Sequence, residues 1–361
     1  MLKKEGTGDW QDTSTPARRW VEEVSEGEIK RMVDRGFKGY STLVRAQPGS
    51  LILKPRYADL MDKLYNFEFR PDDILIMTYP KSGTTWMQEL VWSLTHPDHL
   101  HQADFHTISS RSSFLEVDVI TSLETQQSNT SLMSRFWDVC GRDSRPEDGI
   151  QLQMIAQSPS SKQNPRIIKT HLPFTHLPPN LLETCKVIYM SRDPRDVCVS
   201  YYHFCRLIAT YQFEGSFNDF VQSFIRGETY YGEVWDHCKA AWTHRAHHNL
   251  HFISYEALQS DLTTSLTSLA SFLGLHASPQ FLKIVEEHAS FTNMKLRHDK
   301  MPLSFSSKMI PGKGSFFREG VCGTWTKMAD PDMQTLMSHW IQQRESHLGF
   351  GLPFNQETIH I

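Results

Sequence analysis

The chain has 361 residues, of which 39% are hydrophobic and 22% are charged, and these values are ordinary for a globular protein. Its formal net charge of -4 gives no general attraction to nucleic acid or to an anionic membrane, so any basic site must be local. No stretch reaches the roughly 18 apolar residues of a membrane span, and residues 1–20 lack the apolar core of a secretory signal. We therefore expect a cytoplasmic protein with neither a nucleic-acid nor a membrane partner.

The polar composition of two segments separates them from the rest of the chain. Residues 1–45 carry alternating charges, and we expect an N-terminal extension with a flexible lead and one amphipathic helix. The domain is expected over residues 46–355. Within it, residues 116–165 are rich in Ser, Gln, Asp and Pro, which predicts an inserted surface segment and makes a lid one candidate role.

Apolar runs and helical patterns alternate from residue 57 onward. A short helix is predicted at 56–67, a buried strand at 74–79, and a helix after Gly83 with its apolar residues on one face. Further strands are predicted within 166–173, 186–190 and 250–258, and a helix over 265–274 ends at Gly274. This alternation indicates a single α/β domain with a central, mostly parallel sheet flanked by helices.

The stretch TYPKSGTTW (78–86) follows the first of these strands and is similar to a phosphate-binding loop. The usual P-loop places its lysine after the glycines, whereas here Lys81 precedes Gly83. Gly83 allows close approach of the backbone to an anion, Lys81 adds a full charge, and three hydroxyl groups follow. An ordinary strand-to-helix turn that contains a lysine is the alternative, and the combination favours an anion site.

Arg192 lies at the end of the 186–190 strand, where ligands bind in open α/β sheets. A guanidinium group grips phosphate through two parallel hydrogen bonds, and Ser200 falls in the second turn of a helix that starts near Pro194. Two other interpretations stay open. Arg192 could form a surface pair with a neighbouring aspartate, and Asp193 or Asp196 could serve a magnesium-dependent phosphoryl transfer.

Two more stretches carry polar groups suited to chemistry. Lys169 and His171 are two residues apart on a predicted strand and so share one face, although a structural histidine is an equal alternative. The glycine-rich stretch 312–325 carries Arg318 and is typical of an anion-clamping loop, but its spacing is not that of a dinucleotide fold. Two basic clamps imply a ligand with two separated anionic groups.

Four segments in this order, PKSGTTW, KTHLP, RDPRDVCVSYYHF and FFREGVCGTW, resemble the signature segments of the cytosolic sulfotransferase family. The resemblance covers roughly residues 50–350 without 116–165. It implies a P-loop-like sulfotransferase fold, 3′-phosphoadenosine 5′-phosphosulfate (PAPS) as co-substrate, and no metal. It also implies a small apolar hydroxyl acceptor such as a phenol, an alcohol or a steroid-like compound.

The resemblance also implies a role for individual residues. His171 matches the catalytic base, Lys81, Lys169 and Ser200 complete the catalytic group, and Lys169, His171, Phe114 and Phe174 are expected to contact the acceptor. The donor is expected to bind Lys81, Ser82, Gly83, Thr84, Thr85, Trp86, Arg192, Ser200, Tyr255, Ser290, Phe291, Met294, Phe317, Arg318, Glu319 and Gly320.

Three departures from the family pattern have consequences. Glu319 stands where a lysine is usual, which puts an acid near the expected 3′-phosphate and predicts weaker donor binding unless Glu319 points outward. Thr324 replaces a common aspartate. The stretch after Trp325 lacks the family's dimerisation motif, so the usual dimer is in doubt. The long N-terminus and the insertion suggest an invertebrate branch.

Four other functions are compatible with parts of this pattern. A noncatalytic PAP- or PAPS-binding relative is disfavoured because Lys81 and His171 are both present. A sulfotransferase-like dehydratase, which sulfonates an alcohol and then eliminates sulfate, cannot be distinguished by sequence. A P-loop kinase would require magnesium and ATP. A Golgi sulfotransferase is disfavoured because no membrane anchor precedes the domain.

Overall fold

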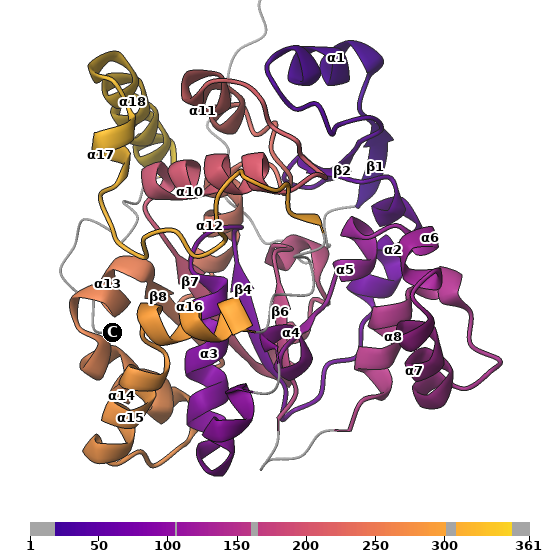
Figure 1. The fold of residues 1–361 in the computed structure, drawn as a ribbon, viewed down its shortest axis with the longest axis vertical. Helices are drawn as coiled ribbons and strands as arrows, with labels where there is room; N and C mark the ends of the chain where they lie inside the picture. Colours follow the sequence, from indigo (N-terminus) through magenta and orange to yellow (C-terminus); the bar gives the residue numbers. More distant parts are fainter. Residues whose placement is uncertain (1–18, 105–106, 160–164, 301–307, 349–361) are drawn as a thin grey trace, which may run out of the picture.

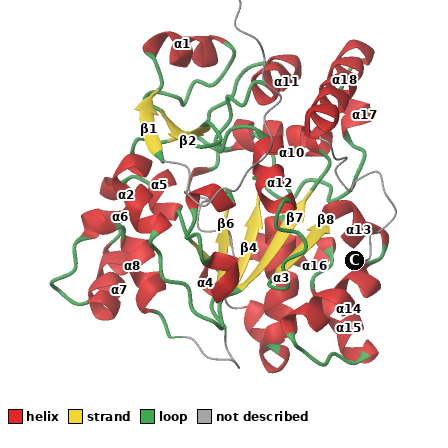
Figure 2. Ribbon diagram, turned by 180° about the vertical axis from the view of Figure 1, so that it is seen from behind, coloured by secondary structure: helices red, strands yellow, loops and turns green. Residues whose placement is uncertain are grey.

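A five-stranded parallel sheet forms the centre of the computed structural model, which describes residues 19–104, 107–159, 165–300 and 308–348 (Figure 1). The strand order is β5-β6-β4-β7-β8, and every neighbouring pair is parallel (Figure 2). The strands are β4 (Ile74–Thr78), β5 (Ser113–Phe114), β6 (Ile167–Thr170), β7 (Lys186–Ser191) and β8 (Leu250–Ser254). The predicted parallel α/β sheet is confirmed, and only the two-residue β5 was not foreseen.

Alternate side chains of the central strands face two different layers of helices. In β4, Ile74 and Ile76 belong to one apolar cluster, whereas Leu75 and Met77 belong to the other. Burial on both faces explains why this strand reads as a continuous apolar run rather than as an alternating one. The first layer contains α3 (Thr84–Thr95), α13 (Tyr255–Ser260), α14 (Leu262–Leu273) and α15 (Pro279–His288). The second layer contains α2 (Arg56–Tyr65), α10 (Pro194–Leu207), α11 (Phe217–Ile225) and α12 (Val234–Trp242).

The N-terminal part of the described chain forms a second, antiparallel sheet. Its strands are β1 (Trp20–Glu23), β2 (Val44–Gln47) and β3 (Leu51–Leu53), with α1 (Glu26–Asp34) between the first two. Ser25 caps α1 by accepting a hydrogen bond from the backbone of Glu28. Met32 and Leu43 are buried in the main core. The expected helix is therefore present, and residues 20–45 pack into the core of the domain; residues 1–18 lie outside the described part.

The described residues of the segment 116–165, which we expected to be an insertion, form a small cluster of helices at one side of the molecule (Figure 1). It contains α5 (Val117–Ile120), α6 (Leu123–Gln127), α7 (Thr130–Cys140), η2 (Pro146–Asp148) and α8 (Ile150–Gln157). Phe136, Ile150 and Met154 form a separate apolar core. The buried carboxylate of Asp118 accepts hydrogen bonds from the backbone of Gln151 and Leu152 at 3.1 and 2.8 Å, which ties α5 to α8. Residues 160–164 of the expected insertion are not described.

The remaining helices are η1 (Pro97–Asp104), α4 (Ile108–Arg111), η3 (Phe174–His176), α9 (Leu181–Thr184), α16 (Phe291–Lys300), α17 (Trp325–Met328) and α18 (Pro331–Leu348). Most of these helices are short, and α16 and α18 are the longest of them. Among the described residues, no helix combines the length and the apolar character that a bilayer crossing needs.

Candidate active site

The loop between β4 and α3 turns sharply at the carboxyl end of the sheet. Lys81 has φ of 71° and Gly83 has φ of 101°, so both adopt the left-handed region. A Cβ atom at Gly83 would lie 2.7 Å from side-chain atoms of both Met190 and Tyr255. Only glycine fits this position, and the free backbone N–H groups at the start of α3 are positioned for an anion. The other predicted residues here are Ser82, which is buried in the loop, and Thr84 and Thr85, which open α3.

The ammonium group of Lys81 lies against aromatic rings and among other cations. Its Nζ is 4.2 Å from the ring centre of Phe204 and 4.4 Å from that of Phe316. Burial lowers the pKa of Lys81 to about 7, and nearby positive charges lower it as well. These charges belong to Arg192, Lys169 and Arg318. Four cations that repel one another at one end of the sheet make this region a receptor for an anion.

Arg192 is held in place while part of its hydrogen-bonding capacity stays unused. Its guanidinium donates to the backbone carbonyls of Lys81 at 3.3 Å and Val321 at 3.1 Å, and it lies 4.2 Å from the ring centre of Tyr255. Only 8% of the residue is exposed, and Nε has no hydrogen-bond partner among the described residues. A buried donor without a partner is costly, and an anionic ligand is suited to accept from it.

The two carboxylates that follow Arg192 are engaged within the protein. Asp193 pairs with Arg195 at 2.6 Å, so the predicted alternative of a surface pair with Arg192 does not form at Asp193. Asp196 anchors the 312–325 loop to the start of α10. It accepts hydrogen bonds from the backbone N–H groups of Gly323 at 2.6 Å and Trp325 at 3.2 Å, and from the Thr324 hydroxyl at 3.2 Å. The uncommon Thr324 therefore supplies a donor to this anchor.

The anchored loop contains an ion pair and a close contact with α16. The Arg318 guanidinium lies 2.8 Å from the Glu319 carboxylate and donates to the Thr324 hydroxyl at 3.3 Å. Glu319 is thus turned toward Arg318 rather than away from it. Gly320 has φ of 68°, and a Cβ atom there would lie 2.4 Å from the ring of Phe291. The loop can lie against α16 only because this position is glycine.

Aromatic rings connect the predicted donor-binding residues. Trp86 contacts Tyr255 with ring centres 5.3 Å apart, and the Arg192 guanidinium lies over the ring of Tyr255. Phe291 meets Phe317 at 5.9 Å. The two remaining predicted residues are Ser290, directly before α16, and Met294, buried within that helix. Flat apolar surfaces next to a cationic loop suit a nucleotide base.

The imidazole of His171 is fixed in one tautomer. Its Nδ1 lies 2.9 Å from the backbone carbonyl of Thr78, which only accepts, so Nδ1 carries the hydrogen and Nε2 carries the lone pair. Phe114 and Tyr231 meet the ring edge-to-face at 5.4 and 5.5 Å. Burial lowers the pKa of His171 well below its usual value, and the charge of Lys169 lowers it further. The ring is therefore neutral at physiological pH.

Three other predicted residues differ in how close they lie to this ring. Lys169 has its Nζ 4.3 Å from the ring centre of Phe114, and burial lowers its pKa to about 8. Ser200 lies half-buried in the second turn of α10. Phe174 meets His244 at 5.1 Å instead, whereas the aromatic rings that meet His171 in the described structure are Phe114 and Tyr231.

Sequence reasoning missed three residues that contact His171 or its strand. Glu116 accepts a hydrogen bond from the His171 backbone at 2.6 Å, His237 bonds to the His171 carbonyl at 3.0 Å, and Tyr231 packs on the ring. A carboxylate inside the apolar stretch FLEVDVI was the one signal that could have indicated Glu116. His237 and Tyr231 reach the site only through long-range packing, which no local pattern records.

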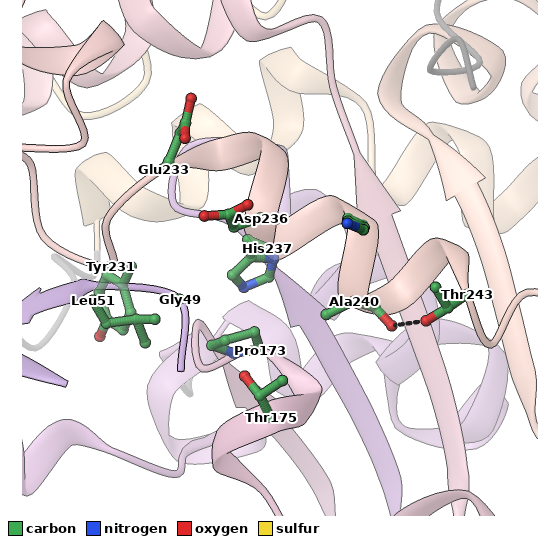
Figure 3. Close-up of a pocket in the computed structure, with 11 residues that line it drawn as sticks. Gly49, Leu51, Pro173, Thr175, Tyr231, Glu233, Asp236, His237, Ala240 and Thr243 are labelled. Carbon is green, nitrogen blue, oxygen red and sulfur yellow. Dashed lines mark hydrogen bonds between the residues drawn. The ribbon is translucent and has the colours of Figure 1, made fainter. Parts of the chain in front are cut away.

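A pocket of about 320 Å³ is lined by residues of α12, among them Asp236 and His237 (Figure 3). Figure 3 shows Pro173 and Thr175 on one wall and Asp236 and His237 on the opposite one. Tyr231 also lines it, so two of its lining residues contact His171 directly.

Residues 71–349 match the model of the sulfotransferase domain. The chain belongs to this family. The sulfotransferase 1E1 of Mus musculus is 31% identical to this chain over 278 residues, which are 76% of this chain and 84% of the mouse protein. The luciferin sulfotransferase of Photinus pyralis is 29% identical over 303 residues, 81% of this chain and 77% of the firefly protein.

Solved structures agree with this assignment. Retinol dehydratase, crystallised with androsterone and the inactive cofactor PAP, superposes with a TM-score of 0.79 and 28% sequence identity. The superposition covers 94% of this sulfotransferase and 99% of that chain. The match to the family model also contains all four motifs, from the Lys81 loop to the 312–325 loop, so the resemblance seen in the sequence is confirmed.

Proposed function

We propose that this protein transfers a sulfuryl group from PAPS to the hydroxyl oxygen of a small apolar acceptor, with His171 as general base. The observation that carries the proposal is the convergence of Lys81, Lys169, Arg192 and Arg318 next to a neutral histidine with a fixed tautomer. Such a site binds a ligand of high negative charge and offers a lone pair for a proton.

The donor is assigned to the cationic end of the sheet. The Lys81 loop, through residues 81–86, would hold the 5′-phosphosulfate, and Arg192, Ser200 and residues 317–320 would hold the 3′-phosphate. Trp86, Tyr255, Ser290, Phe291 and Met294 would surround the adenosine. The unused Nε donor of Arg192 supports this assignment, as does the PAP complex of retinol dehydratase. The expectation that no metal takes part stays a prediction, and turnover in the presence of EDTA tests it.

The proposed transfer conserves charge and protons at named atoms. The acceptor oxygen forms a bond to sulfur while the bond from sulfur to the 5′-phosphate oxygen breaks, and the electron pair stays on PAP. The acceptor proton passes to Nε2 of His171. Lys81 offsets the charge that builds on the leaving oxygen, and Lys169 stabilises the moving group. By analogy with phosphoryl transfer, the contribution of the protein is positioning and electrostatics.

Burial, with a further contribution from the neighbouring cations, lowers the pKa of Lys81 and keeps its side chain partly unprotonated in the free protein. With a pKa of about 7 in the free protein, Lys81 carries a proton only about half of the time at neutral pH. A bound anion favours the ammonium form and raises this pKa. Donor binding therefore charges the lysine that the transfer needs.

A dehydratase is the second candidate because the superposition on retinol dehydratase covers nearly all of both chains. In that route the acceptor alcohol is first sulfonated, and the sulfate ester then loses sulfate and a neighbouring proton to give an alkene. The donor site and the role of His171 in the first step are the same in both routes. The product alone separates them.

The proposal is tested by incubating the protein with PAPS and a panel of phenols, aliphatic alcohols, steroids and retinol. Mass spectrometry then follows PAP, sulfate esters and alkenes. We expect PAP together with a sulfate ester of at least one acceptor. An alkene without an accumulating ester would establish the dehydratase. PAP binding without any product would favour a noncatalytic protein, and phosphorylation of an acceptor by ATP and magnesium would favour a kinase.

We also propose where this protein is located and how it assembles. We assign the protein to the cytoplasm and its partners to small molecules, because the relatives that it matches are sulfotransferases named for, or crystallised with, small compounds. The missing dimerisation motif predicts a monomer, or a dimer with another interface, which sedimentation of the purified protein will distinguish.

A further inference from the structure

Two side chains from outside its strand form hydrogen bonds with the backbone of His171, one at the N–H and one at the carbonyl. On one side, Oε1 of Glu116 accepts a hydrogen bond from the His171 N–H at 2.6 Å. On the other side, Nε2 of His237 lies 3.0 Å from the His171 carbonyl oxygen. The ring itself bonds to Thr78. The residue is thus tied at its backbone nitrogen, its backbone oxygen and Nδ1.

Glu116 has a buried carboxylate that accepts hydrogen bonds from three groups around His171. It directly follows β5 and the buried Leu115, and 1% of it is exposed. Besides the His171 N–H, it accepts from the Thr170 hydroxyl at 2.8 Å and from the Tyr231 hydroxyl at 3.3 Å. Because Tyr231 also packs on the imidazole, one carboxylate fixes both the backbone of His171 and a ring that contacts it.

The hydrogen bonds of His237 determine where its proton lies. The carbonyl of His171 only accepts, so Nε2 of His237 carries the hydrogen, and Nδ1 accepts from the Tyr189 hydroxyl at 2.8 Å. Burial lowers the pKa of His237 to about 4, so the ring is neutral at physiological pH and both bonds persist. His237 is a rigid link between α12 and the strand end.

We propose that Glu116 and His237 are positioning residues that clamp His171 for proton transfer, and that the carboxylate of Glu116 also keeps Lys169 protonated. The second part rests on position: Glu116 bonds to Thr170 and His171, the two residues that follow Lys169, and β5 pairs with β6 at Lys169. From this position the charge of Glu116 favours the ammonium form of Lys169. The inference rests on the proposed function in so far as it assigns His171 and Lys169 to the transfer. Neither Glu116 nor His237 belongs to the predicted set of site residues.

The charges around Lys169 determine the sign of the effect. Burial raises the pKa of Glu116 to about 7 and lowers that of Lys169 to about 8. The other titratable groups near this pair are His171, Lys81, Tyr57 and Tyr231. Above about pH 7 the carboxylate is ionised and opposes the loss of a proton from Lys169. Without that charge, Lys169 loses its proton at lower pH.

Glu116→Gln tests the electrostatic part, because glutamine keeps an oxygen for the His171 N–H and removes the charge. We expect kcat to fall about 10- to 100-fold, because the amide NH₂ of glutamine cannot accept from the Thr170 hydroxyl and a small displacement of His171 follows. The alkaline limb of the kcat profile should move to lower pH, while the Kd for PAP stays unchanged. An unchanged alkaline limb would overturn the assignment of Glu116.

Two variants of His237 test the clamp itself. His237→Phe fills the same space without a donor, whereas His237→Gln keeps an N–H for the His171 carbonyl. We expect kcat to fall about tenfold in the phenylalanine variant and to recover in part in the glutamine variant, with KM for PAPS unchanged. Thr243→Val, which alters the same pocket beyond His237, should behave as wild type. Equal losses in both His237 variants would contradict a positioning role.

A readout without turnover separates this inference from the proposed function. In protein labelled with ¹³C-lysine, the Cε signal of Lys169, assigned with Lys169→Arg, reports its pKa directly. We expect a lower pKa in Glu116→Gln than in wild type. If wild type forms no product with any acceptor, the proposed function fails, yet this titration still confirms or overturns the link between Glu116 and Lys169. An identical pKa in both proteins would overturn it.

Discussion

Two groups of buried charges on this chain differ in whether they are neutralised. In α3, the buried carboxylate of Glu89 pairs with Arg111 at 2.9 Å, Arg297 at 2.8 Å and His288 at 2.9 Å. At the end of the sheet, Lys81 and its neighbours are cations that repel one another. The first group joins α3 to α4, α15 and α16, and the second joins the ends of strands.

The pKa values are lowered in both groups, but the shift favours the charged form of Glu89 and the neutral form of the lysines. Burial raises the pKa of Glu89, but its hydrogen bonds and cationic partners outweigh burial and lower the pKa to about 2. For Lys81 and Lys169, burial lowers the pKa values to about 7 and 8. The first group is complete in the free protein and holds helices together. The second group contains a buried donor without a partner among the described residues, Nε of Arg192, and we propose that a bound anion completes this group.

The largest expected effect comes from Glu89→Gln, which removes the acid and leaves its cations. We expect the free energy of unfolding to fall by about 3–5 kcal/mol, the typical cost of breaking a buried pair. Because folding lowers the pKa of Glu89, this stabilisation is present above pH 4.5 and is lost as the pH falls toward about 2. Urea unfolding measures it, with the exposed Glu124→Gln as control. A loss no larger than that of the control would show that the two groups do not differ.

Lys81→Met should act in the opposite way on the free protein. Removing one of several repelling cations leaves the free energy of unfolding unchanged or raises it, while the gain from PAP is lost. In wild type, PAP at 100 times its Kd should add about 2.7 kcal/mol. Thermal unfolding with and without PAP checks both parts, with the exposed Lys283→Met as control. A destabilised free protein that still binds PAP normally would contradict this assignment.

The smallest expected effect concerns the ion pair inside the anion-binding loop. Glu319 pairs with Arg318, so a donor phosphate must compete with the carboxylate. Glu319→Lys should lower the Kd for PAP by up to about fivefold at low salt, because partly exposed ion pairs are worth about 1 kcal/mol or less. Calorimetric titration measures it, and Glu124→Lys gives the same change of charge at a distance. Equal affinity in all three proteins would show that Glu319 does not compete.

The parts of the fold that local sequence determines were predictable. β4, β7 and β8 are apolar runs, and the glycine turn at 83 and the start of α10 at Pro194 follow directly from residue type. The helices of 116–165 were not predicted, because the segment has a polar composition and its short helices share only a small apolar core. Contacts at the site such as the bond between His237 and His171 join residues far apart in the chain, and no local pattern encodes those pairings.

The same limit applies to the candidate site. The Lys81 loop, Arg192 and the pair Lys169 and His171 were recognisable because each lies at the end of a predicted strand. Glu89 bonds to Arg297, which is 208 residues away in the chain, so its role depends on how α16 packs against α3. The tautomer of His171 likewise depends on a carbonyl in another strand.

The central claim is that a neutral His171 takes the acceptor proton beside an anion-binding cluster that holds the donor independently. His171→Ala, assayed with PAPS and an accepted hydroxyl compound, tests it most directly when the Kd for PAP is measured in parallel. The account predicts that kcat falls about 10²- to 10⁴-fold, the usual contribution of a positioned base, with no change in that Kd. Near-normal turnover in His171→Ala would contradict it.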